Sequence, residues 1–148
     1  MNRIERIDSD KEQYLHLLLE ADPDRDVVMQ YLPEGELYVM FSGDEAVCAA
    51  VVTQVSADEC ELKNIACARP GQGFGSGMIA YLCRRYKPQY RTMLVGTADA
   101  SVQNIRFYEK NGFAYSHTVR NFFIDNYSEP IYESGRLCVD MVCMRKEL

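Results

Sequence analysis

The sequence lacks several features that define whole classes of protein. No stretch approaches the roughly 20 consecutive apolar residues of a membrane-spanning helix, and the N-terminal segment has no apolar core of about 7 to 15 residues, the mark of a secretory signal. We therefore expect a cytoplasmic protein without a membrane partner. Only two histidines are present, His16 and His117, so we expect no histidine-rich metal site and predict no bound metal.

The six cysteines lack the spacing of a disulfide framework or a zinc site. No CxxC pair occurs, and each cysteine falls within an apolar stretch that looks like a strand or a helix. We predict that all six are reduced thiols in or near the core.

Positive charge is also scarce, with 16 basic against 22 acidic residues and a net charge of −6. We expect no nonspecific nucleic-acid partner, because such binding depends on neutralising phosphates. The acidic balance weakly favours a cationic substrate. The length of 148 residues, 47% of them hydrophobic, predicts a single domain over residues 1–148.

Hydrophobic periodicity predicts strands and helices that alternate along the chain. Strands are expected at 3–8, 37–41, 46–55, 61–68, 92–97, 113–124 and 137–145. A first helix is expected after a cap at Ser9 or Asp10 and before Asp22-Pro23, and further helices around 24–31, 76–87 and 101–111. This order predicts an α/β (α+β) protein whose mixed sheet carries helices on both faces.

Segment 70–77 joins a predicted strand to a predicted helix and has glycine at every second position from Gly71 to Gly77. Free backbone N–H groups at such a helix N-terminus bind phosphate. The nucleotide P-loop is excluded, because no lysine occurs between Lys63 and Lys87. The strict two-residue spacing also fails the dinucleotide fingerprint G-x-G-x-x-G.

This loop resembles the pyrophosphate loop of the GNAT (GCN5-related) N-acetyltransferases, whose motif is [RQ]-x-x-G-x-[GA]. Residues 72–77, QGFGSG, match the motif literally. In a second register, Gly73-Phe74-Gly75 is the family's G-x-G, Ser76 opens the helix and Pro70 takes the Gln/Arg position. The two registers differ in the role that they give Gln72.

A second motif carries the same resemblance. Residues 101–113, SVQNIRFYEKNGF, are similar to the family's N-x-x-[AG]-x-x-[FL]-Y-x-K-x-G-F segment, with Ser101 replacing asparagine and Asn104 at a position often held by alanine. Segments 61–68 and 92–97 look like the family's fourth and fifth strands. The resemblance implies a three-layer fold with a mostly antiparallel sheet of about six to seven strands and a splay between strands four and five.

The resemblance also implies an acetyl-CoA-dependent N-acetyltransferase that moves an acetyl group directly to a primary amine of a small molecule or peptide. In such proteins the pantetheine arm of coenzyme A lies along strand four like an added strand. The cofactor-binding residues implied for this chain are Ile65, Ala66, Cys67, Gln72, Gly73, Phe74, Gly75, Ser76, Asn104 and Tyr108.

Acyl transfer to an amine needs a base for the amine proton and an acid for the leaving thiolate. By resemblance Tyr108 is the acid and Glu61 the base. Strand alternation predicts that Glu61, Lys63, Ile65 and Cys67 share one face, so Lys63 is equally an ion-pair partner for Glu61. Other candidate bases are Asp125, Glu133, Asp140 and His117. Catalysis through an acylated cysteine is not expected, because no histidine is placed to activate a thiol.

Segment 121–135 is both aromatic and acidic, and in this family the corresponding region tends to line the acceptor site. Phe122, Phe123, Tyr127 and Tyr132 are predicted to form a box for an aliphatic or cationic amine. A surface loop pinned by its aromatic residues, or a homodimer contact, is an equal alternative. Two non-enzymatic alternatives also remain: an acyl-CoA sensor, and a structural subunit in which the glycine turn is only a connection.

Overall fold

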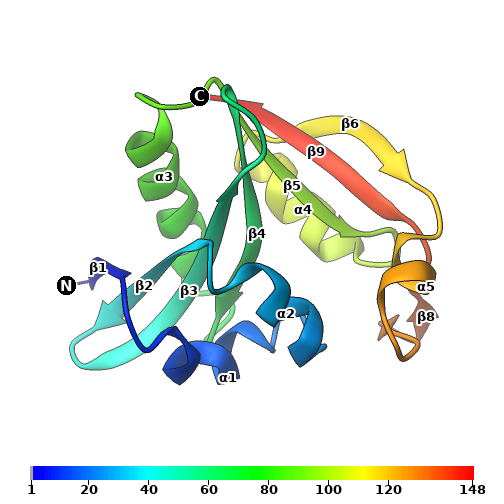
Figure 1. The fold of residues 1–148 in the computed structure, drawn as a ribbon, viewed down its shortest axis with the longest axis horizontal. Coiled ribbons are helices and arrows are strands. Elements are labelled where there is room, and N and C mark those ends of the chain that lie inside the picture. Colours follow the sequence, from blue (N-terminus) through cyan, green and yellow to red (C-terminus); the bar gives the residue numbers. More distant parts are fainter. Residues whose placement is uncertain (1) are drawn as a thin grey trace.

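The computed structural model describes residues 2–148, and its centre is a seven-stranded mixed sheet. The strands lie in the order β1-β2-β3-β4-β5-β9-β6, and β7 and β8 form a separate hairpin (Figure 1). Every neighbouring pair in the sheet is antiparallel except β4 and β5. The predicted mixed, mostly antiparallel sheet is confirmed.

The element bounds agree with most of the predicted ranges. The strands are β1 (Asn2–Ile7), β2 (Glu36–Ser42), β3 (Glu45–Gln54), β4 (Glu59–Cys67), β5 (Thr92–Ala98), β6 (Ala114–Val119), β7 (Tyr132–Glu133), β8 (Arg136–Leu137) and β9 (Met141–Glu147). The helices are a 3-10 turn (Lys11–Tyr14), α1 (Leu15–Leu18), α2 (Arg25–Tyr31), α3 (Phe74–Tyr86), α4 (Val102–Lys110) and α5 (Phe122–Asn126).

The parallel strands β4 and β5 pair over only part of their length. Their register runs from Glu59 opposite Thr92 to Leu62 opposite Val95. Both strands continue, to Cys67 and Ala98, without pairing with each other, and the two ribbons diverge in Figure 1. The predicted splay between the fourth and fifth strands is confirmed.

A β-bulge in β4 lies at the start of the divergence. Val51 of β3 pairs with Asn64 and the next residue, Val52, pairs with Leu62, so Lys63 is the extra residue. A bulge shifts side-chain alternation by one position. Leu62 and Ile65 therefore face the same core, whereas Asn64 points to the opposite face. The prediction that Glu61 shares a face with Ile65 is wrong, because simple alternation does not allow for the bulge.

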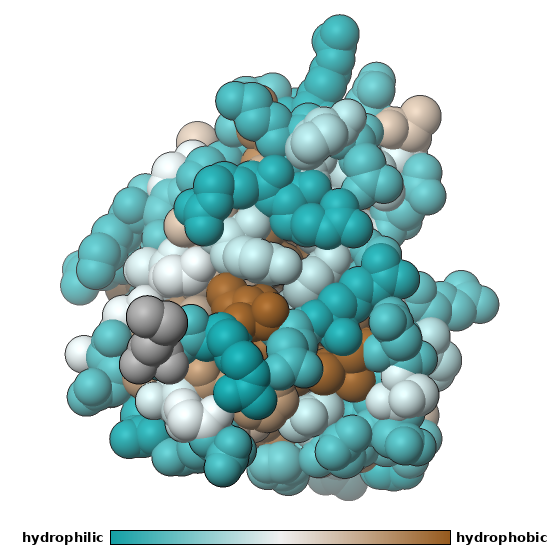
Figure 2. Space-filling view, turned by 90° about the vertical axis from the view of Figure 1, so that its left-hand side faces the viewer, coloured by the Kyte–Doolittle hydropathy of each residue, from teal (hydrophilic) through white to brown (hydrophobic). Residues whose placement is uncertain are grey.

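Helices cover both faces of the sheet, and each face has its own apolar core. One core lies under α3 and α4 and the other under α1 and α2. The largest fully buried side chains belong to both cores, which indicates that the helices on each face pack closely against the sheet. Figure 2 views the side that carries β1 and α3, where hydrophilic residues predominate and hydrophobic ones show in small patches.

The C-terminal region differs from the prediction. The strand expected at 113–124 ends at Val119, and α5 begins at Phe122. Asn121 has a left-handed backbone, and its N–H donates to the Asp140 carboxylate at 2.9 Å, which turns the chain into the helix. Aromatic residues favour strands only as a context-dependent tendency, and tertiary contacts override it here.

No helix within residues 2–148 has both the length and the apolar character needed to cross a membrane.

Candidate active site

The unpaired part of β4 offers backbone groups to the gap beside it. The N–H of Ala68 donates to the carbonyl of Val47 at 2.9 Å, so Cys67 and its partner Cys48 form a non-hydrogen-bonded pair of the β3–β4 ladder. In such a ladder the backbone groups of Cys67 and Ile65 point away from β3, toward the gap, while those of Ala66 point to β3. An extended ligand in the gap would therefore meet Ile65 and Cys67 rather than Ala66.

The N-terminus of α3 supplies a group of free backbone donors next to this gap. The first intrahelical bond of the helix comes from Gly77, which donates to Gly73 at 3.0 Å, so the N–H groups of residues 74–76 have no acceptor within the helix. The N-cap residue is Gly73, so no N-cap side chain accepts from these N–H groups, and the first turn contains no acidic residue. These donors and the helix dipole together suit a pyrophosphate.

Two glycines of the loop are needed for different reasons. Gly73, the N-cap, has φ 79°, and a Cβ atom added there would meet nothing within 4 Å. A Cβ atom at Gly75 would lie 2.9 Å from the Phe107 ring and 3.5 Å from the Cys67 sulfur. Gly75 thus allows α3 to pack against α4 and β4. The helix begins at Phe74, two residues before the predicted Ser76, with Gln72 outside it.

Tyr108 is on α4 and packs in the core between the sheet and helices α3 and α4. It is 8% exposed and packs edge-on against Phe107 and Phe113. Burial, and secondarily the nearby Cys67 thiol, raise the pKa of Tyr108, so its hydroxyl stays protonated at neutral pH. Within residues 2–148 that hydroxyl has no hydrogen-bond partner. Asn104, one turn earlier on α4, is exposed.

Glu61 lies on the opposite face of the sheet, toward α1 and α2. Its carboxylate is 3.7 Å from the Lys63 ammonium, and its side chain is 22% exposed. It also contributes to the raised pKa of Tyr31 and of Cys143, in each case after a larger effect of burial. Glu61 and Tyr108 therefore lie on opposite faces of the sheet, and Glu61 lies just before the gap, in the part of β4 that still pairs with β5, opposite Leu94.

A partly buried polar network lies on the Glu61 side and was not predicted. The hydroxyl groups of Tyr31 and Tyr127 each donate to the carboxylate of Asp22 at 3.0 Å. The side-chain amide of Asn64 donates to the Tyr31 hydroxyl and to the Leu18 carbonyl, both at 3.1 Å. Burial raises the pKa of Asp22, although both tyrosine hydrogen bonds oppose that shift. No local sequence pattern signals such contacts.

The predicted aromatic residues are only partly brought together. Phe122, Phe123 and Tyr127 form a cluster with ring centroids 5.2 to 6.4 Å apart, and Phe123 stacks on Tyr127. Tyr132 lies outside this cluster, 63% exposed on β7. Asp125 is on α5, Glu133 on β7 and His117 on the exposed strand β6.

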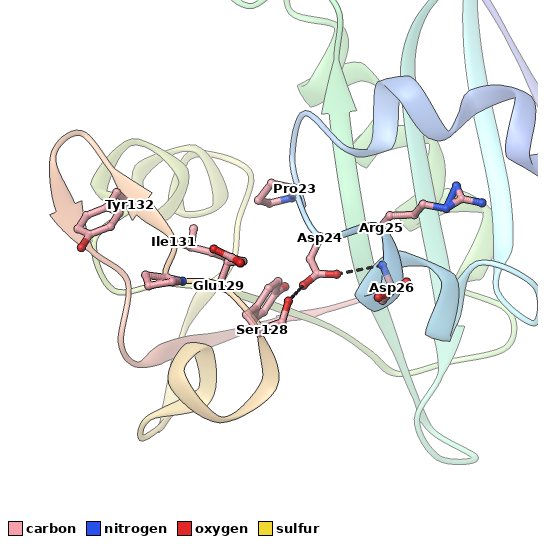
Figure 3. Close-up of a pocket in the computed structure, with 10 residues that line it drawn as sticks. Pro23, Asp24, Arg25, Asp26, Ser128, Glu129, Ile131 and Tyr132 are labelled. Atoms are coloured by element: carbon pink, nitrogen blue, oxygen red, sulfur yellow. Dashed lines mark hydrogen bonds between the residues drawn. The ribbon is translucent and has the colours of Figure 1, made fainter.

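A cavity of about 450 Å³ separates the loop before α2 from the segment after α5. Pro23 and Asp24 lie on one side and Ile131 and Tyr132 on the other, and the Ser128 hydroxyl donates to the Asp24 carboxylate at 3.4 Å (Figure 3). Tyr127 also lines the cavity. The walls carry three carboxylates against one guanidinium, that of Arg25, together with proline and aromatic rings. This composition suits an amine with aliphatic or aromatic groups.

The whole chain is similar to proteins of one enzyme family. It is 33% identical over 149 residues to YvbK, an uncharacterized N-acetyltransferase of Bacillus subtilis, with 99% of this chain and 96% of that protein covered. The chain belongs to the GNAT family of N-acetyltransferases. No family model matches the sequence.

Solved structures of GNAT proteins agree with this assignment. A GNAT family acetyltransferase from Elizabethkingia anophelis with acetyl-CoA bound is 33% identical, with a TM-score of 0.95 over 99% of this chain and 98% of that one. A Bacillus subtilis acetyltransferase in complex with CoA is 32% identical, with a TM-score of 0.90 over 100% and 99%. The predicted family, enzyme class and acetyl-CoA donor are confirmed at the level of the GNAT family.

Proposed function

We propose that this GNAT protein transfers an acetyl group from acetyl-CoA directly to a primary amine of a small molecule or peptide. The observation that carries the proposal is the unpaired gap between β4 and β5, which ends beside the free N–H groups of residues 74–76. A pantetheine arm in the gap would pair with Ile65 and Cys67, and the pyrophosphate would bind at the start of α3.

The proposed chemistry needs no covalent enzyme intermediate. The neutral amine nitrogen attacks the thioester carbonyl carbon, the carbon–sulfur bond breaks, and the products are an amide and coenzyme A. Glu61 takes the amine proton, directly or through water, and Tyr108 donates to the departing thiolate. Because Tyr108 remains protonated, it can hydrogen-bond the sulfur as negative charge develops there.

The proposed acceptor site is the cavity between Pro23–Asp26 and Tyr127–Tyr132 together with the polar network around Asp22. Carboxylates on one wall favour an acceptor that carries positive charge, in agreement with the acidic balance of the chain. Tyr132 and Tyr127 offer aromatic surface for its aliphatic or cationic part.

The proposal also includes a single domain over residues 1–148 that acts in the cytoplasm. A homodimer through the C-terminal segment stays a prediction, to be tested by the mass of the protein in solution.

Two measurements on the purified chain test the function. Calorimetry with CoA should give saturable binding, and incubation of acetyl-CoA with a panel of polyamines, amino acids, aminoglycosides and peptides should release free thiol with at least one of them. Binding of CoA without thiol release from any amine would favour the sensor alternative. Absence of CoA binding would overturn the proposal.

A further inference from the structure

Two cysteines meet where β4 enters the proposed donor site, and the acetyl-transfer mechanism uses neither. The sulfur atoms of Cys48 and Cys67 are 2.9 Å apart. The two residues are direct partners in the β3–β4 ladder, in a non-hydrogen-bonded pair, where opposite side chains lie closest. A disulfide needs Cα atoms about 4.4 to 6.8 Å apart, a range that such pairs meet, and its formation would bring the sulfur atoms from 2.9 Å to about 2.05 Å. The two strands therefore already hold the thiols in position for a cross-link.

The two thiols differ in access. Cys48 is fully buried, whereas Cys67 is partly exposed at the end of β4. The Cys67 sulfur lies beside the first turn of α3, as its 3.5 Å distance from a Cβ atom built on Gly75 shows, and close enough to Tyr108 to affect that hydroxyl. Cys67 is thus the thiol that a small oxidant entering the gap would reach first.

The surroundings of Cys67 also favour its reactive form. A hydrogen bond joins the two thiols; it lowers the pKa of the more exposed Cys67 and raises the pKa of the buried Cys48. A helix N-terminus such as that of α3 stabilises a thiolate further. A thiolate next to a second thiol is the arrangement found in cysteines that oxidise reversibly.

We propose that Cys67 and Cys48 are an oxidisable dithiol at the donor site, which a peroxide converts to a disulfide and which bound acetyl-CoA shields. The Cys67 thiolate attacks one peroxide oxygen, the oxygen–oxygen bond breaks, and hydroxide leaves and becomes water. The Cys48 sulfur then attacks the resulting sulfenic sulfur, the sulfur–oxygen bond breaks, and a second water leaves with the Cys48 proton. Two thiols are oxidised and one peroxide is reduced.

The shielding follows from the position of Cys67. Its backbone faces the gap that the pantetheine arm is proposed to occupy, and its side chain borders the helix N-terminus proposed for the pyrophosphate. A bound donor would cover the route to the sulfur. Oxidation should therefore be confined to protein that lacks its donor.

The test treats the reduced, full-length protein with hydrogen peroxide and follows thiol titration and peptide mass. Wild-type protein should lose two titratable thiols and yield a Cys48–Cys67 cross-linked peptide that dithiothreitol reverses. Cys48→Ala should give no cross-link and should leave a Cys67 sulfenic acid that dimedone traps. Cys143→Ala, which removes another partly exposed thiol, should form the cross-link at the wild-type rate.

Acetyl-CoA, which has no free thiol, tests the shielding. At a concentration one hundredfold above its Kd it should slow cross-linking by about 100-fold, because only about 1% of the protein remains free. Failure of wild-type protein to form the Cys48–Cys67 peptide would overturn the proposal. An unchanged rate in protein that calorimetry shows to be saturated would overturn the shielding. Calorimetry on the reduced protein measures acetyl-CoA binding directly, so a failure of cross-linking or of shielding can be distinguished from a failure to bind the donor.

Discussion

The proposed donor and acceptor halves of this GNAT site differ in the parts of the chain that build them. The donor half comprises β4 from Lys63 to Cys67, the start of α3 at residues 73–76, and Tyr108. It relies mainly on backbone groups, which long elements hold in place: β4 has 9 residues and α3 has 13.

The acceptor half comprises residues 22–26 and 121–132. Its elements are short, since α5 has 5 residues and β7 only 2, and two side-chain hydrogen bonds, Tyr127 to Asp22 and Ser128 to Asp24, join its two segments. Loops carried by a rigid scaffold are where substrate recognition varies most freely. We infer that the donor half fixes the cofactor and the acceptor half fixes the choice of amine, so substitutions in the two halves should affect different constants.

Gly73→Asp should give the largest effect and should act on the donor alone. The position is open and has a left-handed backbone, which aspartate tolerates better than most residues, but the new charge would lie beside the pyrophosphate. Repulsion of about 4 kcal/mol, estimated for charges roughly 4 Å apart near a protein surface, corresponds to ~1000-fold in the Kd for CoA. Calorimetry measures it, with Gly73→Asn as the uncharged control of the same shape. Equal losses in the two variants would show that the backbone strain, and not the charge, is responsible.

Tyr108→Phe should lower kcat by about 100-fold and change the Kd for CoA little, because only the proton donor is lost. The ring packing against Phe107 and Phe113 is retained. Steady-state kinetics with the best amine of the panel, together with CoA calorimetry, separate the two constants. A normal kcat would remove Tyr108 from the chemistry and leave it a core residue.

Glu61→Gln should lower kcat by a similar factor, about 100-fold, if the carboxylate takes the amine proton. If Glu61 deprotonates the bound ammonium before attack, the loss should shrink as pH rises, because more of the amine is then already neutral. Glu59→Gln is the matched control, since Glu59 lies two residues earlier on β4 and hydrogen-bonds to Ser56 outside the gap. If both variants keep the wild-type pH–rate profile, Glu61 is only the ion-pair partner of Lys63.

Tyr132→Ala should have a smaller effect, confined to the acceptor. Loss of aromatic contact with the amine costs about 1 kcal/mol, or roughly fivefold in the KM of that amine, with the Kd for CoA unchanged. Tyr115→Ala is the control, because Tyr115 is equally exposed, at 63%, and lies on β6 outside the cavity. A change in CoA affinity with Tyr132→Ala would break the separation between the halves.

The same division explains what the sequence could predict. The glycine spacing at 71–77 and the apolar pattern of the strands are local signals of backbone structure, and they located the loop and the strands of the sheet, whereas the splay was implied by the resemblance to the GNAT family. The bulge at Lys63 depends on pairing with β3 and is invisible to simple alternation, so the face of Glu61 was predicted wrongly relative to Ile65.

The acceptor half could not be predicted in this way. The contact between Asp22 and Tyr127 joins residues far apart in the chain, and neither has a neighbour in sequence that signals the other. Likewise α5 forms because Asp140 binds the N–H of Asn121, against the strand tendency of the aromatic residues that follow.

The smallest predicted effect concerns the pH dependence of stability and arises from Asp22 in the acceptor half. Burial raises the pKa of Asp22 above its ordinary 3.8, so between 3.8 and the raised value the folded state holds a proton that the unfolded state has lost. The free energy of unfolding therefore falls as pH rises through that window, and below the window this cost is absent.

Denaturant unfolding at a series of pH values should show that Asp22→Asn removes this dependence of the unfolding free energy on pH. Tyr127→Phe should steepen it, because the Tyr127 hydrogen bond lowers the pKa of Asp22. Parallel curves for all three proteins would mean that Asp22 titrates alike in the folded and unfolded chains, and that its partly buried position does not raise its pKa.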